Sequence, residues 1–250
     1  MVAVAIFVRA LSNPSLPKDI LQQAELSKVL LRAGDSVSLV NLTTKKTDEI
    51  VSRHQLIIMS KPSKLLVAVA DPQGERLLAV EGKLFYLPSP HQEVQELVDA
   101  ESRRARFADS TLSREEIGLG FQLARFYTAQ EAGKAQREGK EALVWQLSPK
   151  QEGLNYPTAK LWVDPQTKMP LKIEFFGGAG DLQRVIEFGE FVKFEGSWLA
   201  DMVKVHSVLD GHSTELKVLS RKSQFLFDLL FTPEQLKNLQ FEPPQRSDEK

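Results

Sequence analysis

Histidine and acidic side chains are the groups in this sequence best suited to catalysis or metal binding, and their spacing supports neither strongly. The four histidines are His54, His91, His206 and His212. If Asp210-Gly211 forms a two-residue hairpin turn, His206 faces Glu215 across the hairpin. This pair offers two metal ligands and no third, so an ordinary cross-strand polar pair is the simpler interpretation. We predict no metal site.

The remaining candidate motifs also have simpler structural explanations. Glu115-Glu116 could act as an acid/base pair, but adjacent helical residues point about 100° apart. Ser113 followed by Glu116 is typical of a helix capping box. Gly177 to Gly180 lies between two strand patterns and indicates a hairpin turn rather than a phosphate cradle. The chain has no cysteine, which excludes thiol nucleophiles and disulfides. We predict no catalytic residues, no cofactor and no enzymatic activity.

A basic run of Arg103, Arg104 and Arg106 has two interpretations. It could bind an acidic partner or lipid head groups, or it could lie on a solvated loop. The whole chain of 250 residues has a net charge of −1, so no global field attracts nucleic acid. We expect no nucleic-acid partner and, because no run approaches the roughly 20 apolar residues of a membrane span, no transmembrane segment.

The elements that would position these residues are mostly strands. Strand patterns at 56–59, 65–70, 77–80 and 84–87 are separated by short turns, and six more follow at 142–147, 159–163, 171–176, 183–188, 202–208 and 214–219. Turns this close together leave no room for crossover helices, so the sheet should be antiparallel. The strand-like period begins at Ser36, where Val37 and Leu39 lead into a polar stretch from 43 to 49.

Helical patterns occur at the start, in the middle and at the end. Apolar residues recur at helical spacing from Pro17 to Leu31, and Thr232-Pro233 opens a short helix that runs to Leu239. The charged, glycine-containing segment 88–126 is interpreted as a mobile flap over the sheet rather than another strand. We predict that helix 17–31 and flap 113–126 pack on the concave face of one twisted sheet.

We predict one domain over residues 16–240. Residues 1–15 are either the remnant of a signal peptide or a disordered start, and residues 241–250 form a polar tail. The concave face is either filled by side chains or left open as a cavity for an apolar ligand. The residues that would line such a cavity are Leu56, Ile58, Leu66, Leu84, Tyr86, Leu119, Phe121, Leu123, Trp162 and Ile173.

Several motifs, in order, carry a family resemblance over about residues 17–240. The run from Met59 to Leu65, the hairpin from Gly82 to Pro88 and the terminal Phe231-Thr232-Pro233 resemble the LolA-type carriers that sort outer-membrane lipoproteins. An uncharacterised branch of that superfamily is more similar still. Its features are found at 109–117, 138–145, 159–164 and 169–175.

The resemblance implies a mainly β fold, a half-open antiparallel barrel with a few short helices on its concave face. It implies a periplasmic carrier that takes acyl chains of lipoproteins or lipids into an apolar interior. An inner-membrane exporter and an outer-membrane acceptor are the implied partners, and we expect a monomer. In these carriers an arginine at the basic-Pro turn helps to hold the lid closed, which implies a latch role for Lys61. The alternative function is a periplasmic sensor or protein-interaction domain on the same fold.

Overall fold

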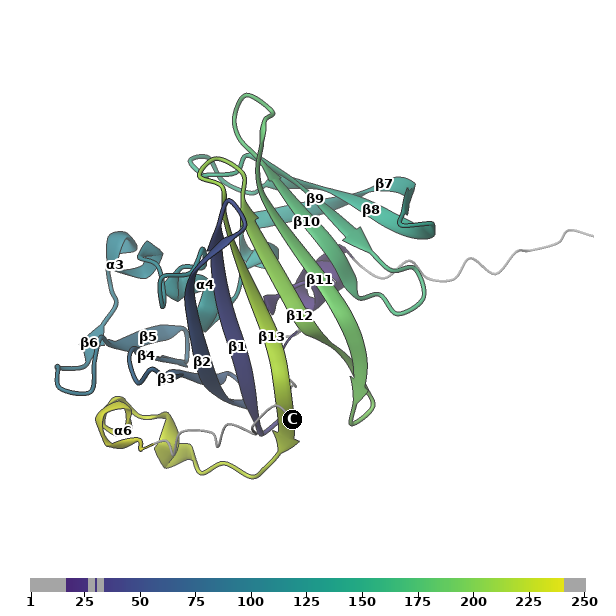
Figure 1. Ribbon diagram of the computed structural model, residues 1–250. Coiled ribbons are helices and arrows are strands. Elements are labelled where there is room, and N and C mark those ends of the chain that lie inside the picture. Colours follow the sequence, from purple (N-terminus) through teal and green to yellow (C-terminus); the bar gives the residue numbers. More distant parts are fainter. Residues whose placement is uncertain (1–16, 27–29, 31–33, 241–250) are drawn as a thin grey trace, which may run out of the picture.

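One antiparallel sheet dominates the part of the chain that the computed structural model describes, residues 17–26, 30 and 34–240 (Figure 1). These residues form thirteen strands in the order β6-β5-β4-β3-β2-β1-β13-β12-β11-β10-β9-β8-β7. Strands β6 and β7 are the two edges, so the sheet is open and does not close into a barrel. The predicted mainly β, half-open architecture is therefore confirmed.

The first six strands form a meander that runs toward one edge of the sheet. Their bounds are β1 Ser36–Lys46, β2 Glu49–Lys61, β3 Lys64–Asp71, β4 Arg76–Val80, β5 Lys83–Leu87 and β6 Gln95–Glu96. The other seven approach from the opposite edge and are β7 Tyr127–Arg137, β8 Lys140–Pro149, β9 Thr158–Val163, β10 Pro170–Phe176, β11 Leu182–Phe194, β12 Ser197–Ser207 and β13 His212–Ser223.

The helices of the described residues are short. They are α1 Pro17–Gln23, α3 Ala100–Arg104, α4 Arg114–Leu119, α5 Leu123–Phe126 and α6 Pro233–Asn238, with a 3₁₀ turn, η1, at Asp228–Phe231. α1 and α4 lie on one side of the curved sheet, and α6 lies on the other side beside β4 and β5 (Figure 1). None of these helices has the length and apolar character that a membrane span requires.

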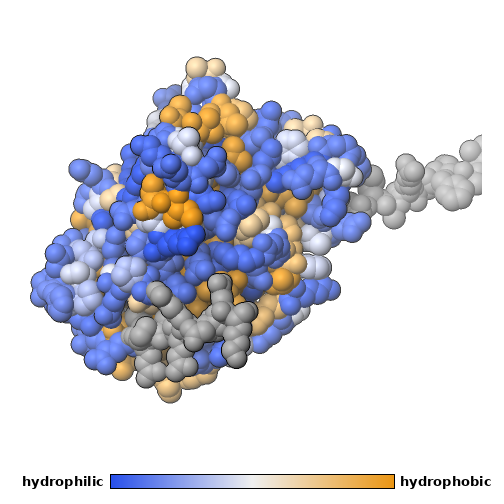
Figure 2. Space-filling model, viewed as in Figure 1, coloured by the Kyte–Doolittle hydropathy of each residue, from blue (hydrophilic) through white to orange (hydrophobic). Residues whose placement is uncertain are grey.

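Strand β3 explains why the sheet has a core on both faces. Six successive residues, 65–70, are buried. Leu65, Val67 and Val69 belong to the main core on the concave face. Leu66 and Ala68 belong to a smaller cluster on the convex face, where Leu226, Phe231 and Leu236 of the C-terminal segment cover them. On the rest of the convex face, between separate apolar patches, the surface is mainly hydrophilic (Figure 2).

Several predicted element boundaries are wrong. The polar stretch 43–49 belongs to the long β1–β2 hairpin, and segment 88–126 contains the short strand β6. Strand β7 was not predicted at all. The β12–β13 hairpin has a four-residue loop, 208–211, so His206 pairs with Ser213 rather than with Glu215. The Gly177–Gly180 turn between β10 and β11 is confirmed.

The predicted continuous helix from Pro17 to Leu31 is also wrong. Helix α1 ends at Gln23, a turn follows at Ala24 and Glu25, and Leu26 and Leu30 are again helical. At this turn Glu25 Oε2 accepts a hydrogen bond from the Gln122 N–H. The predicted segments 1–15 and 241–250 lie outside the described residues, and the predicted domain limits stay predictions.

Candidate functional site

Short helical segments cover the concave face of the sheet. Residues 17–26, 30 and 114–126 form what we call the helical cover. Its apolar side chains belong to the same buried core as the concave strand residues and include Ile20, Leu21, Leu26, Leu30, Ile117, Phe121 and Leu123. The cover is therefore held on the sheet mainly by apolar contact, which is non-directional.

Helix α4 approaches the sheet very closely at Gly118. A Cβ atom added there would lie 2.4 Å from Leu84 Cδ2 and 3.4 Å from Ala79 Cβ. No other residue type fits this position without moving the helix or the sheet side chains. Gly118 therefore sets the distance between the cover and strands β4 and β5.

A capping box fixes the start of α4, as the sequence predicts. Ser113 Oγ accepts a hydrogen bond from the Glu116 N–H at 3.2 Å, and Glu116 Oε2 accepts one from the Ser113 N–H at 2.9 Å. Arg184 of β11 also binds both carboxylate oxygens of Glu116, at 2.6 and 3.1 Å. The capping glutamate thus ties the cover to the sheet through a bidentate ion pair.

Glu25 joins the two parts of the cover. Its Oε2 accepts a hydrogen bond from the Gln122 N–H at 2.8 Å. Burial raises the pKa of the Glu25 carboxyl to about 7, against the opposing effect of backbone N–H groups from Phe121 to Ala124. Gly120, which has a φ of +76°, brings the backbone of this segment close to Glu25 Oε2. The contact joins the end of α1 to the start of α5.

A small cavity lies between the described side chains of the cover and those of the sheet. It has a volume of about 20 Å³, room for about one water molecule. Its lining comes from both the cover and the sheet and consists of Leu26, Leu30, Leu56, Ile58, Leu65, Val67, Ile117 and Leu216. An acyl chain can enter this space only if cover side chains leave it.

Most of the predicted cavity residues come together in this core. Leu56, Ile58, Leu84, Tyr86, Phe121, Leu123 and Ile173 are buried in the main cluster, and Leu119 packs against it half-buried. Arg114 of α4 lies over the Tyr86 ring, with 3.7 Å between the guanidinium carbon and the ring centroid. Their role in lipid binding stays a prediction.

Two predicted lining residues, Leu66 and Trp162, lie on the other face of the sheet. Leu66 belongs to the convex cluster under the C-terminal segment. In β9 the buried residues are Ala159, Leu161 and Val163, so Trp162 points the opposite way. Its indole N–H donates to Glu174 Oε2 at 3.0 Å, and Lys172 Nζ lies 4.5 Å from its ring centroid. Both assignments are corrected, because successive strand residues face opposite sides.

Lys61 binds the C-terminal segment rather than the described residues of the cover. Its Nζ donates to the Leu226 carbonyl at 2.6 Å and lies 3.2 Å from Asp35 Oδ2 and 3.4 Å from Asp228 Oδ1. The Leu226 N–H also donates to Asp35, which holds the pKa of that carboxyl below its usual range. Within the described residues Lys61 thus binds segment 226–228, and its lid-latch role stays a prediction.

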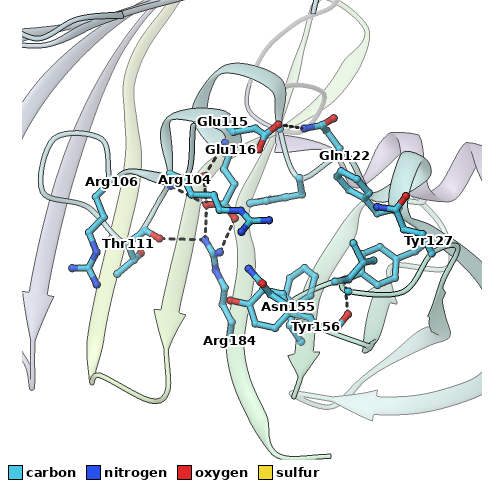
Figure 3. Close-up of a pocket in the computed structure, with 18 residues that line it drawn as sticks. Arg104, Arg106, Thr111, Glu115, Glu116, Gln122, Tyr127, Asn155, Tyr156 and Arg184 are labelled. Atoms are coloured by element: carbon cyan, nitrogen blue, oxygen red, sulfur yellow. Dashed lines mark hydrogen bonds and ion pairs between the residues drawn. The ribbon is translucent and has the colours of Figure 1, made fainter. Parts of the chain in front are cut away.

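A polar groove lies beside the cover (Figure 3). Its volume is about 420 Å³, and it is bounded by the cover, by loop 151–156 and by β11. Its apolar lining includes Phe121 and Phe175 of the main core, with Leu154 and Tyr156 packed against that core. Its polar lining includes Arg104, Glu115, Glu116, Gln122, Asn155 and Arg184. Arg184, Asn155 and Tyr156 were not predicted, because no local pattern connects them with the cover.

The basic run is divided among three environments. Arg103 donates to the Leu97 carbonyl at 2.8 Å and lies 3.5 Å from Glu115. Arg106 forms an ion pair with Asp210 at 2.9 Å and points away from the groove center, whereas Arg104 extends into it (Figure 3). In the described ranges, no group of three or more His, Asp or Glu side chains is placed to hold a metal ion.

An open antiparallel sheet with short helices on its concave face defines the LolA-type fold, and comparisons with known structures confirm that resemblance. A domain from Vibrio parahaemolyticus named for outer-membrane lipoprotein sorting matches with a TM-score of 0.73 and 20% identity, over 88% of this chain and 98% of that one. A LolA superfamily protein from Nitrosomonas europaea matches with a TM-score of 0.68 and 19% identity, again over 88% and 98%.

The sequence itself matches a family model described as "Uncharacterized protein" over residues 59–238, so the chain belongs to that family. A DUF1329 family protein from Desulfovibrio piger has a similar structure, with a TM-score of 0.70 and 17% identity, over 87% of this chain and 98% of that one. Curated proteins give no significant match to the sequence.

Proposed function

We propose that this protein is a periplasmic carrier that binds acyl chains of lipoproteins or lipids between the concave face of its sheet and the helical cover. The observation that supports the proposal most is that the cover fills this face with small separate helices and apolar side chains. Such a cover can exchange its own side chains for an acyl chain on the same apolar surface. The proposed activity is binding and transport, with no covalent step.

Simple energetics support a reversible exchange. Burying an acyl chain contributes about 0.8 kcal/mol per methylene. Moving the cover exposes apolar side chains such as Leu26, Leu30 and Ile117 at a comparable cost per buried carbon. The two terms largely offset each other, so small changes at the cover would decide between loading and release.

The small size of this cavity, among the residues that the structure describes, also favours the alternative, a sensor or protein-interaction domain that never takes up lipid. The cavity of about 20 Å³ holds no acyl chain without rearrangement. The two functions differ in one requirement, since only a carrier needs the cover to leave the sheet.

A disulfide between α4 and β4 tests that requirement. The Cβ position at Gly118 lies 3.4 Å from Ala79 Cβ, close to the Cβ–Cβ distance of a disulfide, and the chain has no other cysteine. We expect the oxidised Ala79→Cys, Gly118→Cys variant to lose binding of a fluorescent fatty acid by more than tenfold. Reduction should restore it, so the reduced form of the same variant controls for the strain that the Gly118→Cys change places on Leu84.

Equal binding by the oxidised and reduced forms, with the disulfide verified by mass spectrometry, would show that α4 does not need to move. Absence of fatty-acid binding by the wild-type protein would contradict the carrier proposal. The sensor or interaction-domain function would then be preferred.

A further inference from the structure

The carboxylate groups of the polar groove are already bound by the protein. Glu116 is held by Arg184 and by the capping box. Glu115 Oε1 accepts a hydrogen bond from Gln122 Nε2 at 3.1 Å and lies 3.5 Å from Arg103. A ligand that donates hydrogen bonds to these carboxylates would have to displace these contacts.

The free polar groups of the groove can donate. Among the described residues, neither the Arg104 guanidinium nor the Asn155 side-chain amide has a hydrogen-bond or ionic partner, although both line the groove. Their side chains point toward Arg184 (Figure 3). A guanidinium carries five N–H donors in a planar fork, and the amide adds two. This arrangement selects a ligand group that accepts hydrogen bonds and carries negative charge.

The other side of the groove is apolar and borders the main core. Phe121 is 9% exposed and Phe175 is 5% exposed, and both belong to the core as well as to the groove lining. The Tyr156 ring packs on Phe175 with 5.0 Å between ring centroids. A molecule seated in the groove therefore meets donors at one end and the edge of the main core at the other.

We infer that the groove binds the anionic head group, a carboxylate or a phosphate, of a single-chain amphiphile. The head group lies between Arg104 and Asn155, and the acyl chain passes Phe121 into the space under the helical cover. This inference rests on the proposed carrier function and specifies its ligand as an anionic lipid.

Paired ligands test the head group and the chain separately. Binding of a fatty acid, of the fatty alcohol of equal length and of inorganic phosphate is measured at pH 8 and low ionic strength by displacement of a fluorescent probe. We expect the wild-type protein to bind the acid at least tenfold more tightly than the alcohol and to bind phosphate weakly. Arg104→Ala should lower affinity for the acid about five- to tenfold and leave the alcohol unchanged.

The matched control is Arg53→Ala, which removes the same charge from an exposed arginine of β2 outside the groove. It should change none of the three affinities. Equal affinity for acid and alcohol, or an equal loss of both in Arg104→Ala, would overturn the head-group site and leave the carrier proposal standing. Phosphate binding as tight as acid binding would show a plain anion site and overturn the lipid assignment. Binding of neither lipid would contradict both proposals.

Discussion

Raising the pH from 5 to 8 should weaken the attachment of the helical cover by about 2 to 3 kcal/mol, because Glu25 titrates. Burial raises the pKa of this carboxyl from 4.5 to about 7 in the closed structure. The closed structure therefore prefers the protonated form. Its stabilising effect is complete below pH 4.5 and is lost as the pH rises through 7. Opening of the cover should become more than tenfold more frequent over this range.

Hydrogen exchange of the peptide that spans residues 114–126 measures this opening. The Glu25→Gln variant should show no such change, since the amide keeps the Gln122 contact without titrating, and comparison at each pH removes the intrinsic pH dependence of exchange. Glu101→Gln, on the exposed start of α3, is the control and should behave like the wild-type protein. Parallel pH profiles for Glu25→Gln and the wild-type protein would contradict the assignment.

Replacing Arg184 by methionine should destabilise the protein by about 3 kcal/mol, the usual cost of breaking a buried ion pair. The Arg184 and Glu116 side chains are 11% and 20% exposed, so Glu116 would keep its charge without a cation in a largely enclosed place. For a chain of this size, the thermal midpoint should fall by about 6 to 12 °C. Urea unfolding measures the free energy directly.

Two further variants separate the charge from the packing. Adding Glu116→Gln to Arg184→Met removes the unpaired charge and should recover part of the lost stability. Arg106→Met breaks an exposed pair with Asp210 and should cost less than about 1 kcal/mol. If Arg184→Met and Arg106→Met have equal effects, the Arg184–Glu116 pair does not anchor the cover.

The sequence predicts the antiparallel sheet well because turns and alternating strands leave local signals. Strand β7 leaves none, since the segment 127–137 is largely polar and lies at the edge of the sheet, where only Tyr127 is buried. The sequence also does not show which face of the sheet Leu66 occupies, because β3 is buried on both sides and its apolar run has no alternation. Trp162 is misleading in the opposite way. This large aromatic residue lies outside the main core, where Glu174 and Lys172 contact its ring.

The candidate site is harder to predict than the fold. The apolar core and the capping box follow from local patterns, and both were found in the sequence. Arg184 and Asn155 join Arg104 only through the curvature of the sheet, which brings β11 and loop 151–156 beside the cover. The break at Ala24 and Glu25 coincides with a contact between Glu25 and Gln122, nearly a hundred positions away in the chain, which helical spacing alone does not reveal.

The pairing of β1 with β13 determines when this protein can finish folding. Ser36 pairs with Ser223, so the center of the sheet joins segments from the two ends of the chain. During synthesis β1 keeps one unpaired edge until β13 has emerged, and such distant contacts form slowly. The nascent chain thus spends a long period with an open strand that other chains could join. A truncation that removes β13 would leave β1 and β12 each without a partner strand on one side. Both would then be sheet edges prone to aggregation.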